Sequence, residues 1–230
     1  MNKRSIPAGS SQSVEDFLKA IYQLQRETDR VSTNALAEAL DISAPAVTDM
    51  AQRLVEDGTV DYLKYRGVRL TETGEQVALK MLRRHRLIET YLVEDLGYQL
   101  HEVHDEAEAL EHTVSDRFVE AISRKLNNPS YDPHGDPIPD LQGVMPVLNL
   151  HPLSELALHT PARIRRLVMD DPAMLRNTQE RGLEIGRTLE VVARDQFDGP
   201  IQIVVDPQDV QTIGFKMASF ILVEFLEPLC

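Results

Sequence analysis

The feature that most restricts the fold of this chain is the nine-residue segment from His104 to His112, HDEAEALEH, with two histidines and four acidic residues. Nothing in this segment breaks a helix. On a helix, four of its side chains fall at positions i, i+4, i+7 and i+8 and share one face: His104, Glu108, Glu111 and His112. A globular helix normally turns such a face toward the core, where unpaired ionisable groups would cost several kcal/mol each. The helix therefore needs a ligand or a charged partner at this face.

Metal binding explains the stripe better than the alternative, a solvated acidic face. That alternative accounts for the acids but not for two histidines in register with them. A second pair with i, i+4 spacing lies upstream in RRHRLIETYL, where His85 precedes Glu89. Two neighbouring helices would then offer imidazole nitrogens and carboxylate oxygens without sulfur, a donor set that suits Mn²⁺, Fe²⁺, Co²⁺ or Zn²⁺.

The composition is typical of a globular protein of two modest domains. The chain has 230 residues, of which 42% are hydrophobic and 27% are charged. Its single cysteine, Cys230, is the last residue, which excludes a disulfide framework and a cysteine-based metal site. The N-terminal segment MNKRSIPAGSSQS lacks the apolar core of a signal peptide, and no apolar run approaches the ~18 residues that span a membrane. We expect a cytoplasmic protein with no membrane partner.

The first part of the chain has the pattern of a winged helix-turn-helix. VEDFLKAIYQLQR, at residues 14–26, places apolar residues at helical spacing. Ser32-Thr33 then precedes ALAEAL, and Ser43 precedes PAVTDMAQRLVEDG, so both helices begin with good N-cap residues. Two short helices joined by a tight turn are typical of a helix-turn-helix. In the following segment, TVDYLKYRGVRLT, apolar and polar residues alternate on both sides of Tyr-Arg-Gly. This pattern predicts a β-hairpin, or wing.

The wing favours DNA binding over the alternative that these elements are only scaffold. The second helix would place its N-terminal residues in the major groove. Among them, only Thr48 and Asp49 can hydrogen-bond a base. Small residues beside them are available to thymine methyl groups: Ala44, Pro45 and Ala46. Further residues are candidates for contacts to the DNA backbone: Ser32, Thr33, Ser43, Arg53, Lys64, Tyr65 and Arg66.

The formal net charge of −13 opposes passive binding to nucleic acid, because that affinity comes mostly from phosphate neutralisation by Lys and Arg. The acidic groups must therefore be neutralised or turned away from the DNA. Because each recognition helix offers few base contacts, a dimer that binds two half-sites is the expected form.

The rest of the chain divides into a helical part and a strand-rich part. Thr71 is the expected cap of a long helix from Glu72 to about Leu96, and a further helix covers roughly His101 to Lys125. NNPSYDPHGDPIPD, which follows, is rich in Pro, Gly, Asn and Asp and predicts an irregular segment. Beyond it, TLEVVARD, IQIVVD and SFILVEFL, together with LEIG, predict a small barrel of about 70 residues.

These segments resemble, over nearly the whole chain, the diphtheria-toxin-repressor family of metal-dependent transcription regulators, including its manganese-sensing branch. VEDFLKAIYQL is similar to the family's first helix, SAPAVTDMAQRL to its recognition helix, and YRGVRLTETG to its wing. RRHRLIETYL and VHDEAEALEH resemble its metal-binding helices, and DPHGDPIPD resembles its Pro-Gly-Asx-Pro-Ile-Pro segment. The last region resembles the SH3-like, or FeoA-like, barrel of the longer members. This resemblance implies a mainly α fold with a small all-β domain.

The resemblance also implies a domain order. Residues 1–75 would form a winged helix-turn-helix DNA-binding domain, and residues 76–145 a helical domain for dimerisation and metal binding. Residues 146–160 would be a linker, and residues 161–230 the SH3-like domain.

By the same resemblance, the primary metal site takes ligands from the first helix and from the stripe: Asp16, Glu108, Glu111 and His112. In iron-sensing relatives the positions of Asp16 and Glu108 hold methionine and cysteine, whereas here both are carboxylates, as in the manganese branch. Hard oxygen ligands favour Mn²⁺, with Fe²⁺, Co²⁺, Zn²⁺ and Cd²⁺ as alternative ions in vitro. The second site would take side chains from two helices and from the barrel: His85, Glu89, His104 and Asp171, or its neighbour Asp170.

One residue departs from the pattern of the small manganese sensors. They carry a glutamate one turn after the first-helix aspartate, where this chain has Lys19. A lysine ammonium has no lone pair to offer a metal. The sequence therefore favours two separate sites over a closely bridged pair of ions.

The expected function is that of a homodimeric, Mn²⁺-responsive transcription regulator of metal homeostasis, which binds a palindromic double-stranded DNA operator and takes no small-molecule substrate. Three alternatives stay open. The first is an iron-responsive regulator of the same fold. The second is a helical di-metal enzyme, because Glu-x-x-Glu-His on helices also occurs in such catalysts, although the sequence offers no obvious nucleophile. The third is a winged-helix protein that binds DNA without metal.

Overall fold

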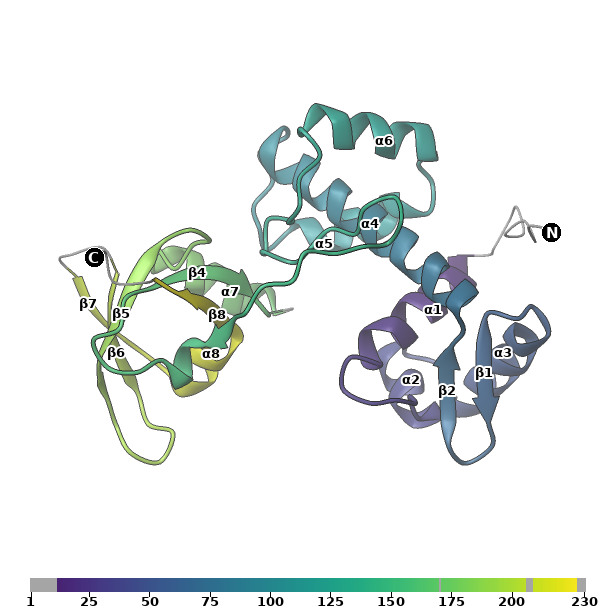
Figure 1. The fold of residues 1–230 in the computed structure, drawn as a ribbon, viewed down its shortest axis with the longest axis horizontal. Helices are drawn as coiled ribbons and strands as arrows, with labels where there is room; N and C mark the ends of the chain where they lie inside the picture. The colour runs from purple at the N-terminus through teal and green to yellow at the C-terminus, as the bar shows by residue number, and fades with distance from the viewer. Residues whose placement is uncertain (1–11, 170, 206–208, 227–230) are drawn as a thin grey trace. The chain divides into compact units, whose positions relative to one another are not determined.

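The computed structural model describes residues 12–169, 171–205 and 209–226. The N-terminal tail, Asp170 and Cys230 lie outside these ranges. The chain forms two compact units (Figure 1): residues Met1–His85 with Pro139–Val144, and residues Arg86–Ile138 with Met145–Cys230. Within the described ranges, no helix combines the length and the apolarity required to cross a membrane.

The first unit is the predicted winged helix-turn-helix. Its elements are α1 (Gln12–Leu24), α2 (Thr33–Ala39), α3 (Ala44–Glu56), β1 (Val60–Leu63), β2 (Gly67–Leu70) and the first part of α4 (Glu72–Glu94). Ser32 caps α2 by accepting a hydrogen bond from the amide of Ala35 at 3.1 Å. Ser43 caps α3 in the same way, with the amide of Ala46 at 3.4 Å. The two N-caps predicted from the sequence therefore set the starts of both helices.

A single apolar core joins these helices to the hairpin. It takes Phe17, Leu18 and Ile21 from α1, and Leu36 and Val47 from α2 and α3. Full burial of one such side chain contributes about 1.5–3 kcal/mol. Because one core holds all three helices, a force that repositions α1 is expected to carry the helix-turn-helix with it.

Strand β2 of the wing is fixed to the segment that precedes α2. The amide and the carbonyl of Val31 each make a 2.8 Å hydrogen bond with Val68. Gly67 has a φ of 100°, and a Cβ at this position would collide with the Val31 carbonyl oxygen, so glycine is required there. Arg30 pairs with the carboxylate of Asp61, and this hydrogen bond is the main reason that the pKa of Asp61 lies below its usual value. Strand β2 is thus held along its length up to Gly67, which leaves only the turn at residues 64–66 beyond the anchored part.

The second unit begins with a helical part formed by the end of α4, α5 (Val103–Glu111) and α6 (Asp116–Lys125). Leu87 and Ile88 of α4 pack with Val103 and Ala107 of α5 in one apolar core. The single helix predicted from residue 101 to residue 125 is wrong: it is two helices, because Ser115 caps α6 by accepting from the amide of Phe118 at 3.3 Å. Serine competes for backbone hydrogen bonds in this way and favours a helix start over a helix interior.

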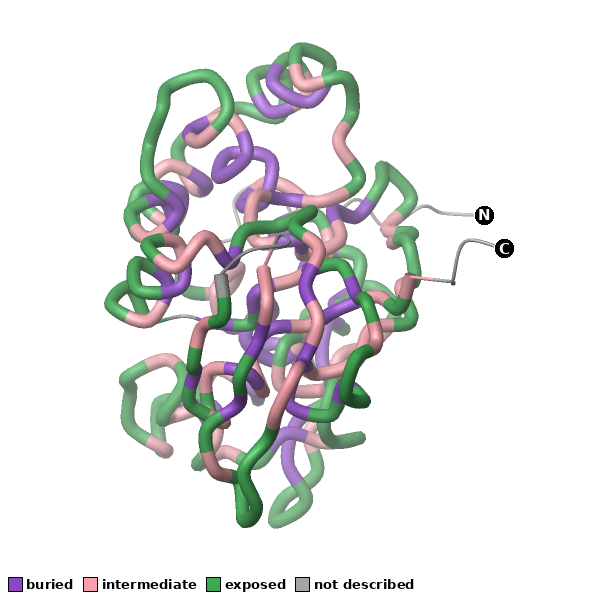
Figure 2. Tube along the Cα trace, turned by 90° about the vertical axis from the view of Figure 1, so that its left-hand side faces the viewer, coloured by how far each residue is buried: buried purple, intermediate pink, exposed green. Residues whose placement is uncertain are grey.

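The C-terminal part of the second unit is a six-stranded antiparallel sheet in the order β3-β8-β4-β5-β6-β7. Its strands are β3 (His151–Pro152), β4 (Ala162–Leu167), β5 (Thr188–Arg194), β6 (Ile201–Val205), β7 (Asp209–Ile213) and β8 (Ile221–Phe225). Three short helical segments accompany them: η1 (Leu153–Glu155), α7 (Pro172–Glu180) and α8 (Phe215–Phe220). In Figure 2, buried stretches alternate with exposed ones along the strands that face the viewer. The pairings among the described residues leave β3 and β7 as the outer strands, so the sheet is open rather than a closed barrel.

The strand-rich part differs in two places from what the sequence predicts. Leu153 and Leu156, within the segment expected to be a linker, are fully buried in the core of the sheet, and β3 pairs with β8. The C-terminal core therefore includes residues before 161. The LEIG segment, which ends at Gly186, is a turn rather than a strand. Gly186 has a φ of 90°, a left-handed conformation that departs from extended strand geometry.

Candidate metal centres and DNA-binding surface

The stripe of His104, Glu108, Glu111 and His112 divides into a buried end and an exposed end. The Glu111 side chain is 0% exposed, and its Oε1 lies 3.4 Å from Nε2 of His112, which follows α5. At the other end of α5, the His104 side chain is 64% exposed, and its Nε2 lies 3.7 Å from Oε2 of Glu108. A carboxylate and an imidazole buried side by side in this way form half of a ligand set for a divalent cation.

The remaining predicted ligand of the primary site lies in the other unit. Asp16 is on α1 and is half-buried, directly before the core residue Phe17. Glu108, Glu111 and His112 belong to the second unit. The structure thus brings Glu111 and His112 together at the end of α5, whereas Glu108 lies beside His104. The participation of Asp16 and of Glu108 in the primary site stays a prediction.

A second group of ligands converges within the second unit. It consists of Glu89 from α4 with Asp132 and His134 from the DPHGDPIPD segment, and their donor atoms lie within 4.8 Å of one another. Nδ1 of His134 is 3.9 Å from Oε2 of Glu89. The other oxygen of Glu89, Oε1, is 3.6 Å from Nδ1 of His104. His104 therefore lies between this group and Glu108.

The second group is electrostatically suited to a cation. Burial, followed by the charges of Asp136 and Glu89, raises the pKa of Asp132 to about 8, against the opposing effect of Arg86. Burial also lowers the pKa of His134, which favours a neutral imidazole. Two buried carboxylates and a neutral imidazole match the hard and borderline donors that Mn²⁺ and its neighbours prefer. The residues present therefore fit a divalent metal ion.

Asp132 and His134 were absent from the ligand set predicted from the sequence. The one signal was His134, an imidazole in a segment made mostly of turn residues. However, an irregular loop has no periodicity, so nothing in the sequence aligned these side chains with Glu89. The predicted ligand His85 is buried one helical turn before Glu89 on α4.

Asp171 has a structural role at the start of α7. Its Oδ1 accepts hydrogen bonds from the amides of Ala173, at 2.8 Å, and Met174, at 3.4 Å. This is the N-cap arrangement that aspartate commonly adopts. Only its second carboxylate oxygen is left for another contact, and its role as a metal ligand stays a prediction.

The predicted DNA-contacting residues lie on two exposed features of the first unit. At the start of α3, Pro45, Ala46 and Asp49 are exposed. Thr48 is half-buried, and its hydroxyl donates to the carbonyl of Ala44 at 3.1 Å, which leaves the hydroxyl oxygen as an acceptor. The caps Ser32 and Ser43 are exposed, as is Arg53 in the last turn of α3, while Thr33 is half-buried.

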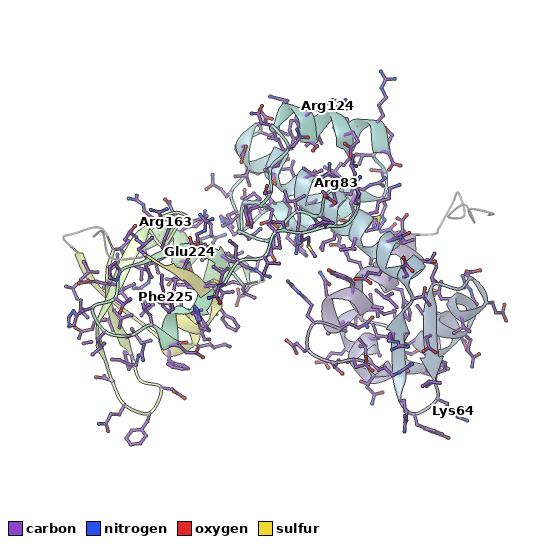
Figure 3. The ribbon with its side chains drawn as sticks, in the orientation of Figure 1. Lys64, Arg83, Arg124, Arg163, Glu224 and Phe225 are labelled. Atoms are coloured by element: carbon purple, nitrogen blue, oxygen red, sulfur yellow. The ribbon has the colours of Figure 1, made fainter. Side chains whose placement is uncertain are left out.

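The turn of the wing carries the second feature. Lys64, Tyr65 and Arg66 are all exposed, Tyr65 to 93%, and Figure 3 shows Lys64 at this turn. Tyr65 has a φ of 67°, and the ammonium nitrogen of Lys64 lies 5.2 Å from the centre of its ring. Two cations on a projecting turn are suited to phosphate contacts, which fix the register of a protein on DNA.

Arg66→Ala is expected to weaken DNA binding for all sequences and to lower the slope of log affinity against log salt by about 1, because one phosphate contact is lost. Thr48→Ala should instead relax the preference between base sequences. Filter binding or anisotropy over a salt series measures both effects. Arg26→Ala, at an exposed arginine just beyond α1, is the control with the same charge change. An unchanged salt slope in Arg66→Ala would remove the wing from the DNA-binding surface.

Comparison with known proteins assigns the chain to a family. A family model for the N-terminal DNA-binding domain of iron-dependent repressors matches residues 10–68. A second, for their metal-binding and dimerisation domain, matches residues 71–140, and a FeoA-domain model matches residues 151–225. The iron-dependent repressor IdeR of Mycobacterium tuberculosis (strain H37Rv) is 32% identical over 224 residues, which cover 92% of this chain and 96% of that protein. The chain belongs to the iron-dependent repressor family.

Other members of this family are similar over the same length. The diphtheria toxin repressor of Corynebacterium diphtheriae is 30% identical and covers 93% of this chain and 97% of its own. Among solved structures, a manganese-dependent transcriptional repressor in complex with manganese is 41% identical, with a TM-score of 0.83 over 93% of this chain and 100% of the other. ScaR with bound Cd²⁺ is 34% identical, with a TM-score of 0.75 over 93% and 99% of the two chains. The protein is a metal-dependent transcriptional repressor, and this family does not consist of enzymes.

Proposed function

We propose that this repressor responds to Mn²⁺. The observation that carries the proposal is the chemistry of the two ligand groups, which contain carboxylate oxygens and imidazole nitrogens and no sulfur. Oxygen donors of this kind favour Mn²⁺ over softer ions. The 41% identity to a manganese-dependent repressor with manganese bound supports the same choice.

The primary centre would be held by Glu108, Glu111 and His112 of the second unit together with Asp16 of α1. The second centre would be held by a larger group: Glu89, Asp132 and His134, with His104, His85 and Asp171 as predicted further ligands. Lys19, buried on α1, offers no lone pair. Two separate centres are therefore proposed rather than one bridged pair.

In the proposed mechanism, the negative charges of Asp16 and of the acidic residues on α5 control the position that α1 adopts. Without a cation, Asp16, Glu108 and Glu111 carry like charges and disfavour a close approach of α1 to α5. A bound divalent cation supplies the positive charge that these carboxylates share. Since Phe17 and Ile21 pack in the core of the helix-turn-helix, fixing Asp16 also fixes the recognition helix. Only a few kcal/mol of differential affinity are needed for such a population shift.

The same proposal describes how the repressor binds its operator. Two copies of the chain would bind a palindromic double-stranded site, each with the start of α3 in the major groove and the turn of the wing on the phosphates. Cation binding also offsets part of the net charge of −13, which otherwise opposes DNA binding.

The test is an electrophoretic mobility shift of DNA from the region upstream of the protein's own gene, across a series of divalent metals. Retardation is expected to require metal, to be reversed by a chelator, and to be half-maximal at lower free Mn²⁺ than Fe²⁺. Chelator-insensitive retardation would reject a metal-dependent response.

The second candidate is an iron-responsive repressor, which the 32% identity to IdeR favours. The same titration separates the two, because an iron sensor should reach half-maximal retardation at the lower free Fe²⁺. The carboxylate at position 108, in place of the cysteine expected in iron-sensing members, is the reason that Mn²⁺ is preferred here.

A further inference from the structure

The DPHGDPIPD segment lies directly against strand β4 of the C-terminal sheet. The amide of Leu167 donates to the carbonyl of His134 at 2.8 Å. Arg166 forms an ion pair with Asp136, and its side chain is only 17% exposed. Between these two contacts, Gly135 has a φ of 85°, and a Cβ there would collide with the backbone carbonyl of Arg165. Residues 134–136 therefore meet residues 165–167 along a close backbone contact.

The same segment is held internally and from α4. Oδ1 of Asp132 accepts hydrogen bonds from the amides of His134 and Asp136, both at 2.9 Å, which closes a tight loop. Arg86 of α4 reaches Oδ2 of Asp132 at 3.5 Å and Asp136 at 3.1 Å, and it donates to the carbonyl of Pro137. The loop that carries two ligands of the second centre is thus fixed on one side by α4 and on the other by β4.

We propose that the FeoA-type domain positions the second metal centre through Arg166 and the backbone of β4, and that it tunes metal affinity without having to supply a ligand side chain. The inference rests on the proposed binding of a divalent cation by Glu89, Asp132 and His134. Arg166 is a positioning residue, because it contacts Asp136 rather than a ligand atom.

Two physical effects of removing Arg166 have opposite signs, and this makes the proposal testable. Loss of a positive charge beside Asp136 leaves more negative charge near Asp132, so by Coulomb attraction alone a cation would bind more tightly. Loss of the contact that fixes the loop would instead let His134 leave the group and weaken binding. Outer-shell partners of this kind typically contribute about 10- to 100-fold to metal affinity.

The experiment measures Mn²⁺ binding to the full chain by electron paramagnetic resonance, with His112→Ala present throughout so that only the second centre is titrated. Arg166→Gln is expected to raise the Kd for Mn²⁺ by at least about tenfold. Gly135→Ala, which changes no charge, should do the same. Arg163→Gln is the matched control, because Arg163 lies on the same strand, is exposed (Figure 3) and carries the same charge; its Kd should stay within twofold. Circular dichroism checks the fold of each variant.

Tighter or unchanged Mn²⁺ binding in Arg166→Gln would overturn the positioning role. An equal loss in Arg163→Gln would overturn it as well, because that result would reflect general charge rather than the loop contact. Asp132→Asn and His134→Ala separate this failure from failure of the proposed centre. If those two variants bind Mn²⁺ as well as the parent chain, the centre itself is absent; if they lose binding while Arg166→Gln keeps it, only the positioning role is wrong.

Discussion

Glu111→Gln should severely weaken the Mn²⁺-dependent DNA binding of this repressor while leaving the metal-free protein at least as stable as the wild type. Glu111 is fully buried beside His112. Glutamine keeps its shape but removes a charge that is costly to bury. The variant therefore loses a ligand of the primary metal centre. In the absence of metal, it also loses the charge repulsion between position 111 and the neighbouring carboxylates. A residue with only a structural role would not give this combination.

Two measurements on each protein test the prediction. In DNA-binding titrations, the free Mn²⁺ for half-maximal binding should rise by more than the ~100-fold upper range for outer-shell residues. In thermal unfolding, the metal-free midpoint should stay level or rise, whereas the Mn²⁺-induced increase should shrink. For one site, that increase corresponds to about 2.7 kcal/mol at a free metal concentration of 100 times Kd. Glu106→Gln, an exposed acid on the same helix, is the control.

A fall in the metal-free midpoint of Glu111→Gln would mean that the carboxylate stabilises the fold and is not held for a metal. Wild-type Mn²⁺ dependence in the same variant would remove Glu111 from the primary centre. The Glu106 control should match the wild type in both measurements, because its side chain is already solvated.

The parts of this fold that the sequence predicted are those in which a local signal and the tertiary structure agree. Ser32 and Ser43 lie before apolar residues at helical spacing, and both cap the helices they were expected to cap. The stripe on α5 could be predicted because its four ionisable groups follow the helical repeat and fall on one face. Ser115 is the same kind of signal, but no glycine or proline lies beside it, so the break between α5 and α6 was missed.

The second metal centre shows why the rest was harder to predict. Glu89 has a helical neighbour, His85, that marks it as a ligand, whereas Asp132 and His134 lie in a loop whose shape depends on Arg86 and on a distant strand. Such contacts join residues far apart in the chain and leave no periodic pattern. Asp171 illustrates the reverse case: an aspartate at a plausible ligand position that caps α7 through Oδ1.

Glu108 is the residue at which ligand hardness can be tested most directly. Its Oε2 lies 3.7 Å from Nε2 of His104, and Nδ1 of the same imidazole lies 3.6 Å from Oε1 of Glu89, so His104 connects Glu108 to the second ligand group. Glu108→Ala should remove a primary ligand and weaken the response to every metal. Glu108→Cys should instead raise the free Mn²⁺ needed for half-maximal DNA binding by at least about tenfold while the response to Fe²⁺, Co²⁺ or Zn²⁺ changes less, because thiolate favours softer ions.

The comparison uses DNA affinity against free metal for the wild type and both variants, all carrying Cys230→Ser so that the introduced thiol is the only one in the chain. Circular dichroism is the control for folding. Unchanged Mn²⁺ dependence in Glu108→Ala would exclude this residue from the primary centre. An unchanged order of metals in Glu108→Cys would leave the centre in place and reject ligand hardness as the origin of its preference, since the thiolate would then occupy the same position without altering which ion the chain selects.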